Sequence, residues 1–148
     1  MENQHYLYLS SENSLDVYPY NSPGMFYCKL PQPLQLQGHW EVALLQIQYM
    51  NAYYAGTEPP RNLFVCTDIC TESTLGNQKT SVLKRINNIN NSLDQPIESE
   101  INHVTYVSVQ QENIDVLRIY IKDDAGKPVI FSQGPLLLTL HLRRISCF

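Results

Sequence analysis

Four histidines, His5, His39, His103 and His141, are the side chains in this sequence best suited to metal binding or proton transfer at neutral pH. They are far apart along the chain and form neither an H-x-H nor an H-x-x-x-H pair. The metal sites of cupin-type barrels place two histidines two residues apart on one strand face, and the sequence has no such pair. We therefore expect each histidine to be exposed or locally hydrogen-bonded, and we expect no bound metal.

The cysteines also argue against a metal or redox site. Cys66 and Cys70 are spaced C-x-x-x-C, whereas redox and zinc sites use C-x-x-C. On an extended strand, positions four apart share a face but stand about 13 Å apart, so one ion could not bind both without a bend. We expect two small buried or half-buried thiols. The N-terminus has no basic start and no apolar core of a signal peptide, so Cys28, Cys66, Cys70 and Cys147 are expected to stay reduced in the cytosol.

The remaining motifs favour turns and loops over catalysis. Asp123-Asp124-Ala125-Gly126 could suggest calcium, but an EF-hand loop needs further ligands and a closing Glu, so a hairpin turn is expected. Arg143-Arg144 could contact a phosphate or an acidic neighbour, and a solvated strand end is the favoured interpretation. The chain contains neither a Gly-rich phosphate loop nor a G-x-S-x-G elbow. The sequence therefore predicts no enzyme and no cofactor.

The composition is poor in charge and rich in amides and tyrosine. Charged residues make up 16% of the 148 residues, against about 25% in a typical soluble domain. The 12 Asn and 11 Gln together nearly equal the 24 Asp, Glu, Lys and Arg, and there are 10 Tyr. Such a surface suits a protein whose faces are buried in contacts. A net charge of −4 gives no electrostatic reason to bind nucleic acid, and no apolar run approaches the length of about 18 residues that a membrane span needs.

Tyrosines in loop segments are the candidate contact residues. Tyr18 and Tyr20 flank a proline in a Pro- and Asn-rich segment, and Tyr53 and Tyr54 follow the longest predicted strand. Loop tyrosines bring a large contact area with few rotatable bonds. They could equally pack as lids over the ends of the fold, and the sequence leaves both interpretations open.

The periodicity along the chain is that of β-strands. In Leu136–Arg143, four leucines alternate with other residues, which is the pattern of a half-buried antiparallel strand. In His39–Met50 the alternation changes phase between Leu44 and Leu45, which predicts a β-bulge. The other candidate strands are His5–Leu9, Met25–Leu30, Asn62–Ile69, Thr80–Ile86, His103–Val109 and Val116–Lys122.

These eight segments, separated by turn residues, predict an all-β fold. A single jelly-roll β-sandwich of about eight antiparallel strands over residues 1–148 is the natural form for such a set. In that topology the first and last strands are neighbours, so His5–Leu9 should pair with Leu136–Arg143. The Asn-rich stretch Ile86–Glu100 is predicted to be a long polar loop.

Several blocks spread along the chain carry a resemblance to a known family. They are Tyr6–Ser11, Lys29-Leu30-Pro31, Trp40-Glu41-Val42-Ala43-Leu44, Leu63–Ile69, Gly126–Gly134 and Leu140-His141-Leu142-Arg143-Arg144. Over nearly its whole length, the chain resembles the penton (vertex minor capsid) proteins of Polinton/Maverick elements and the related adintoviruses.

The resemblance implies a structural protein rather than an enzyme. It implies a single jelly roll that forms homopentamers at icosahedral vertices, beside a double-jelly-roll major capsid protein. The expected location is the capsid vertex of a virion, after synthesis in the host cytoplasm. Tyr18, Tyr20, Tyr53 and Tyr54 are then the candidate subunit contacts, and no direct nucleic-acid binding is expected.

Other jelly-roll functions remain as alternatives. A lectin-like or receptor-binding module of a virion spike or surface protein would be favoured by secretion, yet the sequence has no signal peptide and no cysteine framework. A cupin-type enzyme is disfavoured by the missing histidine pair. A nucleoplasmin-like chaperone would carry a long acidic tail, whereas this chain ends in Arg143-Arg144-Ile145-Ser146-Cys147-Phe148.

Overall fold

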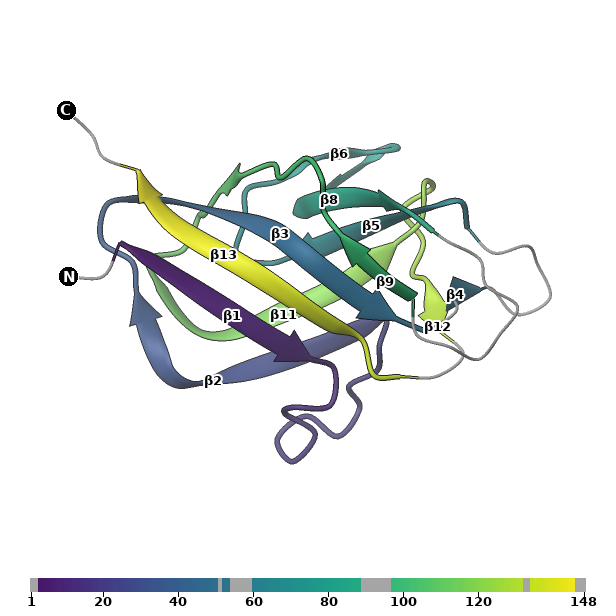
Figure 1. Cartoon of the computed structure of the whole chain (residues 1–148), viewed down its shortest axis with the longest axis horizontal. Coiled ribbons are helices and arrows are strands. Elements are labelled where there is room, and N and C mark those ends of the chain that lie inside the picture. Colours follow the sequence, from purple (N-terminus) through teal and green to yellow (C-terminus); the bar gives the residue numbers. More distant parts are fainter. Residues whose placement is uncertain (1–2, 51, 54–59, 89–96, 132–133, 146–148) are drawn as a thin grey trace.

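A computed structural model describes residues 3–50, 52–53, 60–88, 97–131 and 134–145. Within these ranges every regular element is a β-strand and none is a helix, and all the strand pairs are antiparallel (Figure 1). The prediction of an all-β fold is confirmed. The described part of the chain contains no helix that is long and apolar enough to cross a membrane.

Two sheets form a β-sandwich around one core. The five-stranded sheet has the order β1-β13-β3-β10, and β9 also pairs with β3. The four-stranded sheet has the order β2-β11-β5-β8. The strands of the first sheet are β1 (Gln4–Ser10), β13 (Leu137–Ile145), β3 (His39–Tyr49), β9 (Ile97–Glu100) and β10 (Val107–Ser108). Those of the second are β2 (Met25–Gln35), β11 (Asn113–Lys122), β5 (Asn62–Thr67) and β8 (Val82–Asn87).

Two small two-stranded sheets lie outside these sheets. β4 (Ala52–Tyr53) pairs with β12 (Ile130–Phe131), and β6 (Ser73–Leu75) pairs with β7 (Gln78–Thr80). Gly76, between β6 and β7, has φ +61°, a left-handed conformation that glycine adopts at no steric cost.

The predicted pairing of the first and last strands is confirmed. β1 runs antiparallel to β13, with Leu7 opposite Leu140 and Leu9 opposite Leu138. The other edge of β13 pairs with β3, so β13 lies inside the sheet with a neighbour on each side. Alternate residues along these strands face the second sheet, and together with inward residues of β2 and β11 they form the core. Its fully buried side chains include Phe26, Val42, Leu44, Ile47, Leu117, Ile119, Ile121, Leu140 and Leu142.

The predicted bulge in β3 is also confirmed. Thr139 pairs with Gln46 and Leu140 pairs with Leu44, so Leu45 has no partner on β13. The extra residue changes which positions of β3 face the core: Leu44 before the bulge and Ile47 after it are both buried, while Leu45 is only half-buried. A one-residue insertion of this kind re-aims the side chains that follow it.

Several predicted boundaries are wrong, because tertiary pairing decides where a strand ends. The strand predicted over Met25–Leu30 continues to Gln35. The strand predicted over Asn62–Ile69 ends at Thr67, where the chain turns. The strand predicted over His103–Val109 is reduced to β10. The predicted polar loop Ile86–Glu100 contains β9. This strand pairs with β3, and its Ile97 side chain is buried in the core. The structure also adds β4, β6, β7 and β12.

Truncating the centre of β13 tests this account of the core. Leu140→Ala is expected to lower the free energy of unfolding by about 2–5 kcal/mol, because the removed atoms leave a cavity between the two sheets. Urea denaturation followed by circular dichroism measures the change. Ile130→Ala is the matched control, since Ile130 is 54% exposed, and it should cost less than about 1 kcal/mol. Equal losses in the two variants would contradict the assignment of Leu140 to the core.

Candidate interaction surfaces

His141 is held in a polar cluster on the outer face of the five-stranded sheet. Its Nδ1 lies 2.7 Å from the Tyr106 hydroxyl and its Nε2 lies 2.9 Å from Gln4 Oε1. Because an amide oxygen only accepts, Nε2 carries the proton and Nδ1 accepts from the tyrosine. The Tyr6 ring stacks on the imidazole with centroids 4.6 Å apart. The prediction of a locally hydrogen-bonded histidine is confirmed at His141.

Arg143 extends this cluster along β13. Its guanidinium lies 3.4 Å from the centroid of the Tyr106 ring, and its Nε pairs with the Glu41 carboxylate. Arg143 is exposed near the end of its strand, as predicted, and it also has the acidic neighbour of the alternative, because β3 places Glu41 directly opposite. The adjacent Arg144 side chain lies against Gly38, whose φ of +91° makes the turn into β3.

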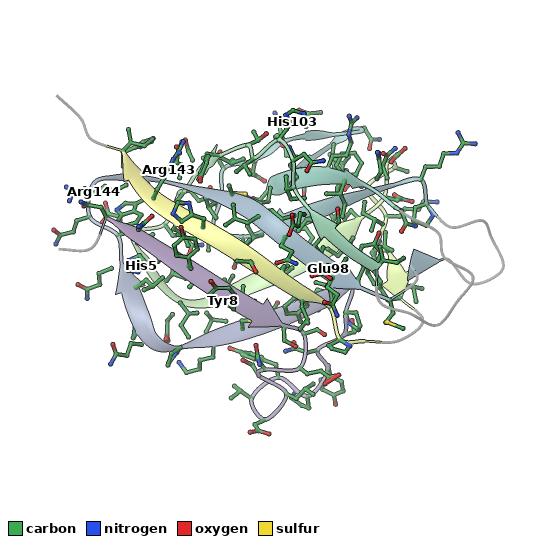
Figure 2. The ribbon with its side chains drawn as sticks, viewed as in Figure 1. His5, Tyr8, Glu98, His103, Arg143 and Arg144 are labelled. Carbon is green, nitrogen blue, oxygen red and sulfur yellow. The ribbon has the colours of Figure 1, made fainter. Side chains whose placement is uncertain are left out.

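The other three histidines lie apart from this cluster. His5 stacks on Trp40 with centroids 5.4 Å apart, and His39 and His103 are exposed. Figure 2 labels His5 and His103, which lie well apart. Among the residues the structure describes, no three His, Cys, Asp or Glu side chains are grouped so that they could hold a metal ion.

The three described cysteines are buried thiols whose ionisation is disfavoured. Cys28, Cys66 and Cys70 are buried and unbridged. Burial raises the pKa of Cys28 and Cys70 to about 11 and that of Cys66 to about 12. The prediction of buried thiols is confirmed for the pair Cys66 and Cys70, although Cys70 lies beyond the end of β5 rather than on the same strand. Cys147 lies outside the described residues.

The acidic segment after β11 is a turn, as predicted. Asp123 Oδ1 accepts hydrogen bonds from the backbone N–H of Ala125 at 2.9 Å and of Lys127 at 2.8 Å. Gly126 completes the turn with φ +79°. The Asp123 carboxylate is thus used as a turn cap.

Tyr18 and Tyr20 lie in the loop between β1 and β2, which projects from one edge of the sandwich (Figure 1). The loop is fixed on β2, because the Asn21 side chain bonds the backbone N–H and C=O of Tyr27, both at 2.9 Å. Tyr18 stacks on Tyr27 with centroids 5.1 Å apart. Tyr20 is 93% exposed, and exposed Val17 lies beside it. Tyr18 therefore packs against the outward-facing Tyr27 of β2, whereas Tyr20 presents its ring to solvent.

The second pair of candidate tyrosines is only partly described. Tyr53 belongs to β4, opposite Ile130 of β12. Tyr54 lies outside the described residues. Whether these two rings contact a partner stays a prediction.

A surface that the sequence analysis missed is the outer face of the five-stranded sheet. Tyr6 is 50% exposed and Tyr8 is 75% exposed, and both project from β1 on the side opposite the core. The signal was present in the sequence, since Tyr6 and Tyr8 alternate with the inward-facing Leu7 and Leu9. Beside Tyr8 lies a shallow hollow of about 340 Å³.

Comparison of the chain with known protein families finds no matching family model, and comparison with curated proteins finds no match either.

The environment of His141 predicts a pH-dependent stability. Burial, and then the nearby positive charge of Arg143, lower the pKa of His141 in the folded protein below the usual value of about 6.5. The unfolded chain then binds more protons in that range, so this contribution is fully present above about pH 6.5 and is lost as the pH falls through the lower folded pKa. Urea unfolding midpoints measured between pH 7.5 and pH 5 should decrease less steeply in His141→Gln than in the wild type. Parallel curves would show that His141 does not contribute.

Proposed function

We propose that this protein is a structural capsid subunit of the penton type, a single jelly roll that forms homopentamers at icosahedral vertices beside a double-jelly-roll major capsid protein. The resemblance to the penton proteins of Polinton/Maverick elements and adintoviruses supplies the function class. The shape of the fold and the chemistry of its outer surfaces are what support it here.

The observation that carries the proposal is the order in which the strands enter the two sheets. Along the chain, β1 and β3 join the five-stranded sheet while β2 and β5 join the other. β8 stays with β5, β9 and β10 both join the five-stranded sheet, and β11 and β13 then alternate again. The first and last strands end as neighbours. This alternation supports a jelly roll, in which each sheet is assembled from strands far apart in sequence.

The surface chemistry fits a subunit that is surrounded by neighbours. Tyr20 on the β1–β2 loop, and Tyr6 and Tyr8 on the sheet face, offer large aromatic areas at low conformational cost. The cores of protein interfaces are enriched in Tyr and depleted of Lys and Glu. A ring would repeat one head-to-tail contact between subunits until it closes.

Native mass spectrometry of the purified protein, alone and with its major capsid partner, tests the proposal. The expected result is a pentamer, free or bound to the partner shell. A species that stays monomeric or trimeric and never engages the shell would contradict the proposal. A protein that binds glycans as a monomer would instead favour the lectin-like alternative, and bound metal with turnover would favour an enzyme.

Tyr20 gives a test at the level of one residue. Tyr20→Ser should leave the free energy of unfolding almost unchanged, because the ring is exposed. It should raise the protein concentration needed for half-assembly about tenfold or more, as expected for loss of an interface aromatic. Val104→Ser is the control, since Val104 is an exposed apolar residue on a different loop. Equal assembly of the two variants would remove Tyr20 from the contact.

A further inference from the structure

The hollow beside Tyr8 spans the outer face of the five-stranded sheet. It is lined by residues of β1, β13, β3 and β9, with a volume of about 340 Å³. In Figure 2, Tyr8 and Glu98 are labelled; they come from β1 and β9, on either side of β13 and β3. The polar residues around it are Tyr8, Ser10, Asn13, Gln46, Gln48, Glu98 and Thr139.

The chemistry of this hollow suits a positively charged side chain. Gln46 Nε2 donates to Glu98 Oε1, which fixes the carboxylate at the rim. Tyr8 offers an exposed ring, and no Lys or Arg lines the hollow. A carboxylate, amide oxygens and an aromatic face together attract a guanidinium or ammonium group. Among the described residues, neither Glu98 nor the nearby Glu100 has an ion-pair partner.

Positive side chains gather on the opposite side of the sandwich. Lys122 on β11 and Arg85 on β8 both stand opposite Phe64 of β5, on the outer face of the four-stranded sheet. Arg118 projects from the same face of β11, with its guanidinium 4.4 Å from the centroid of the Tyr120 ring.

These cations are not used within the subunit as ion pairs. In the described ranges, Arg85, Arg118 and Lys122 have no acidic partner, and Arg118 Nε is buried without a hydrogen bond. By contrast, Lys29 at the β2 edge is paired with Asp115 at 3.0 Å. Arg85 is exposed, so its side chain can reach a neighbouring molecule.

We propose that the hollow on the five-stranded sheet of one subunit receives the positive side chains on the four-stranded sheet of a second copy of this chain. This inference rests on the proposed function, because it names the contact that closes the ring. The two faces lie on opposite sides of one sandwich, so the contact is head-to-tail. When two copies join, one keeps its acidic face free and the other keeps its basic face free. Such a heterologous contact generates a ring when its rotation closes.

The charges orient this contact more than they strengthen it. Exposed ion pairs contribute modest energy, whereas charge complementarity steers association and suppresses wrong pairings. Two copies meeting through like faces would bring Glu98 and Glu100 against themselves, or Arg85 and Lys122 against themselves. The sign difference between the faces therefore favours the head-to-tail arrangement over a back-to-back dimer.

Charge reversal tests the contact on the full chain. Arg85→Glu with Lys122→Glu makes both faces acidic, and Glu98→Lys with Glu100→Lys makes both faces basic. Each double variant should raise the concentration for half-assembly about tenfold or more, measured by native mass spectrometry and sedimentation velocity. The chain carrying all four changes restores opposite signs and should assemble within about threefold of the wild type.

Matched controls separate the contact from general charge effects. Lys127→Glu and Glu72→Lys make the same changes of charge at exposed positions in connecting segments outside the strands of both sheets, and they should leave assembly unchanged. Because Lys122 is half-buried, Arg85→Glu alone provides a second variant at an exposed position, and urea unfolding checks that each protein folds.

The outcomes distinguish this contact from the proposed function. If the wild type forms pentamers and neither reversal weakens them, or if the fourfold variant is not rescued, the contact is overturned while the penton proposal stands. If the reversals affect only binding to the major capsid protein, the second copy is the wrong occupant. If the wild type never assembles under any condition, the contact and the proposed function both fall.

Discussion

The placement of β13 between β1 and β3 fixes both the core and the outer face of the five-stranded sheet. Alternate leucines of β13 face the second sheet, and a slip of one residue would turn them to solvent. The register that buries Leu140 also points His141 and Arg143 outward. The outer cluster with Tyr6 and Tyr106 is thus a consequence of the inner packing, because the two faces of a strand cannot be set independently.

The bulge at Leu45 links this core to the outer hollow. Beyond it, Gln46 and Gln48 project outward, opposite Thr139 and Leu137 of β13, and β9 adds its glutamates to the same face. The scarcity of charge in the sequence is therefore reflected in how charges are distributed over the two outer faces. Among the residues that the structure describes, the charges without an ion-pair partner on the two outer faces have opposite signs, and amides and tyrosines occupy much of the rest. A surface of this kind has few unpaired charges that a contact would bury.

Much of the fold could be predicted because its signals are local. The alternation in β1, β11 and β13 and the phase change in β3 are visible in short windows, and each corresponds to a strand or a bulge. The hydrogen-bonded state of His141 and the buried thiols were also expected. The segment that forms β9 was not, since its sequence is polar and only pairing with β3 makes it a strand. Residue type alone indicates the loop tyrosines as contacts, whereas the outward direction of Tyr8 follows from its alternation with the inward-facing Leu7 and Leu9.

The sequence by itself determined the fold class, the inward faces of the main strands and the turns, because each depends on residues within a few positions of one another. It also predicted that the first and last strands would be neighbours. Only the tertiary structure decided which outward side chains meet: His141 with Gln4 across 137 positions, Arg143 with Glu41, and Gln46 with Glu98. These contacts join strands that are distant in the chain, so their partners depend on sheet order and register, and no local pattern specifies them.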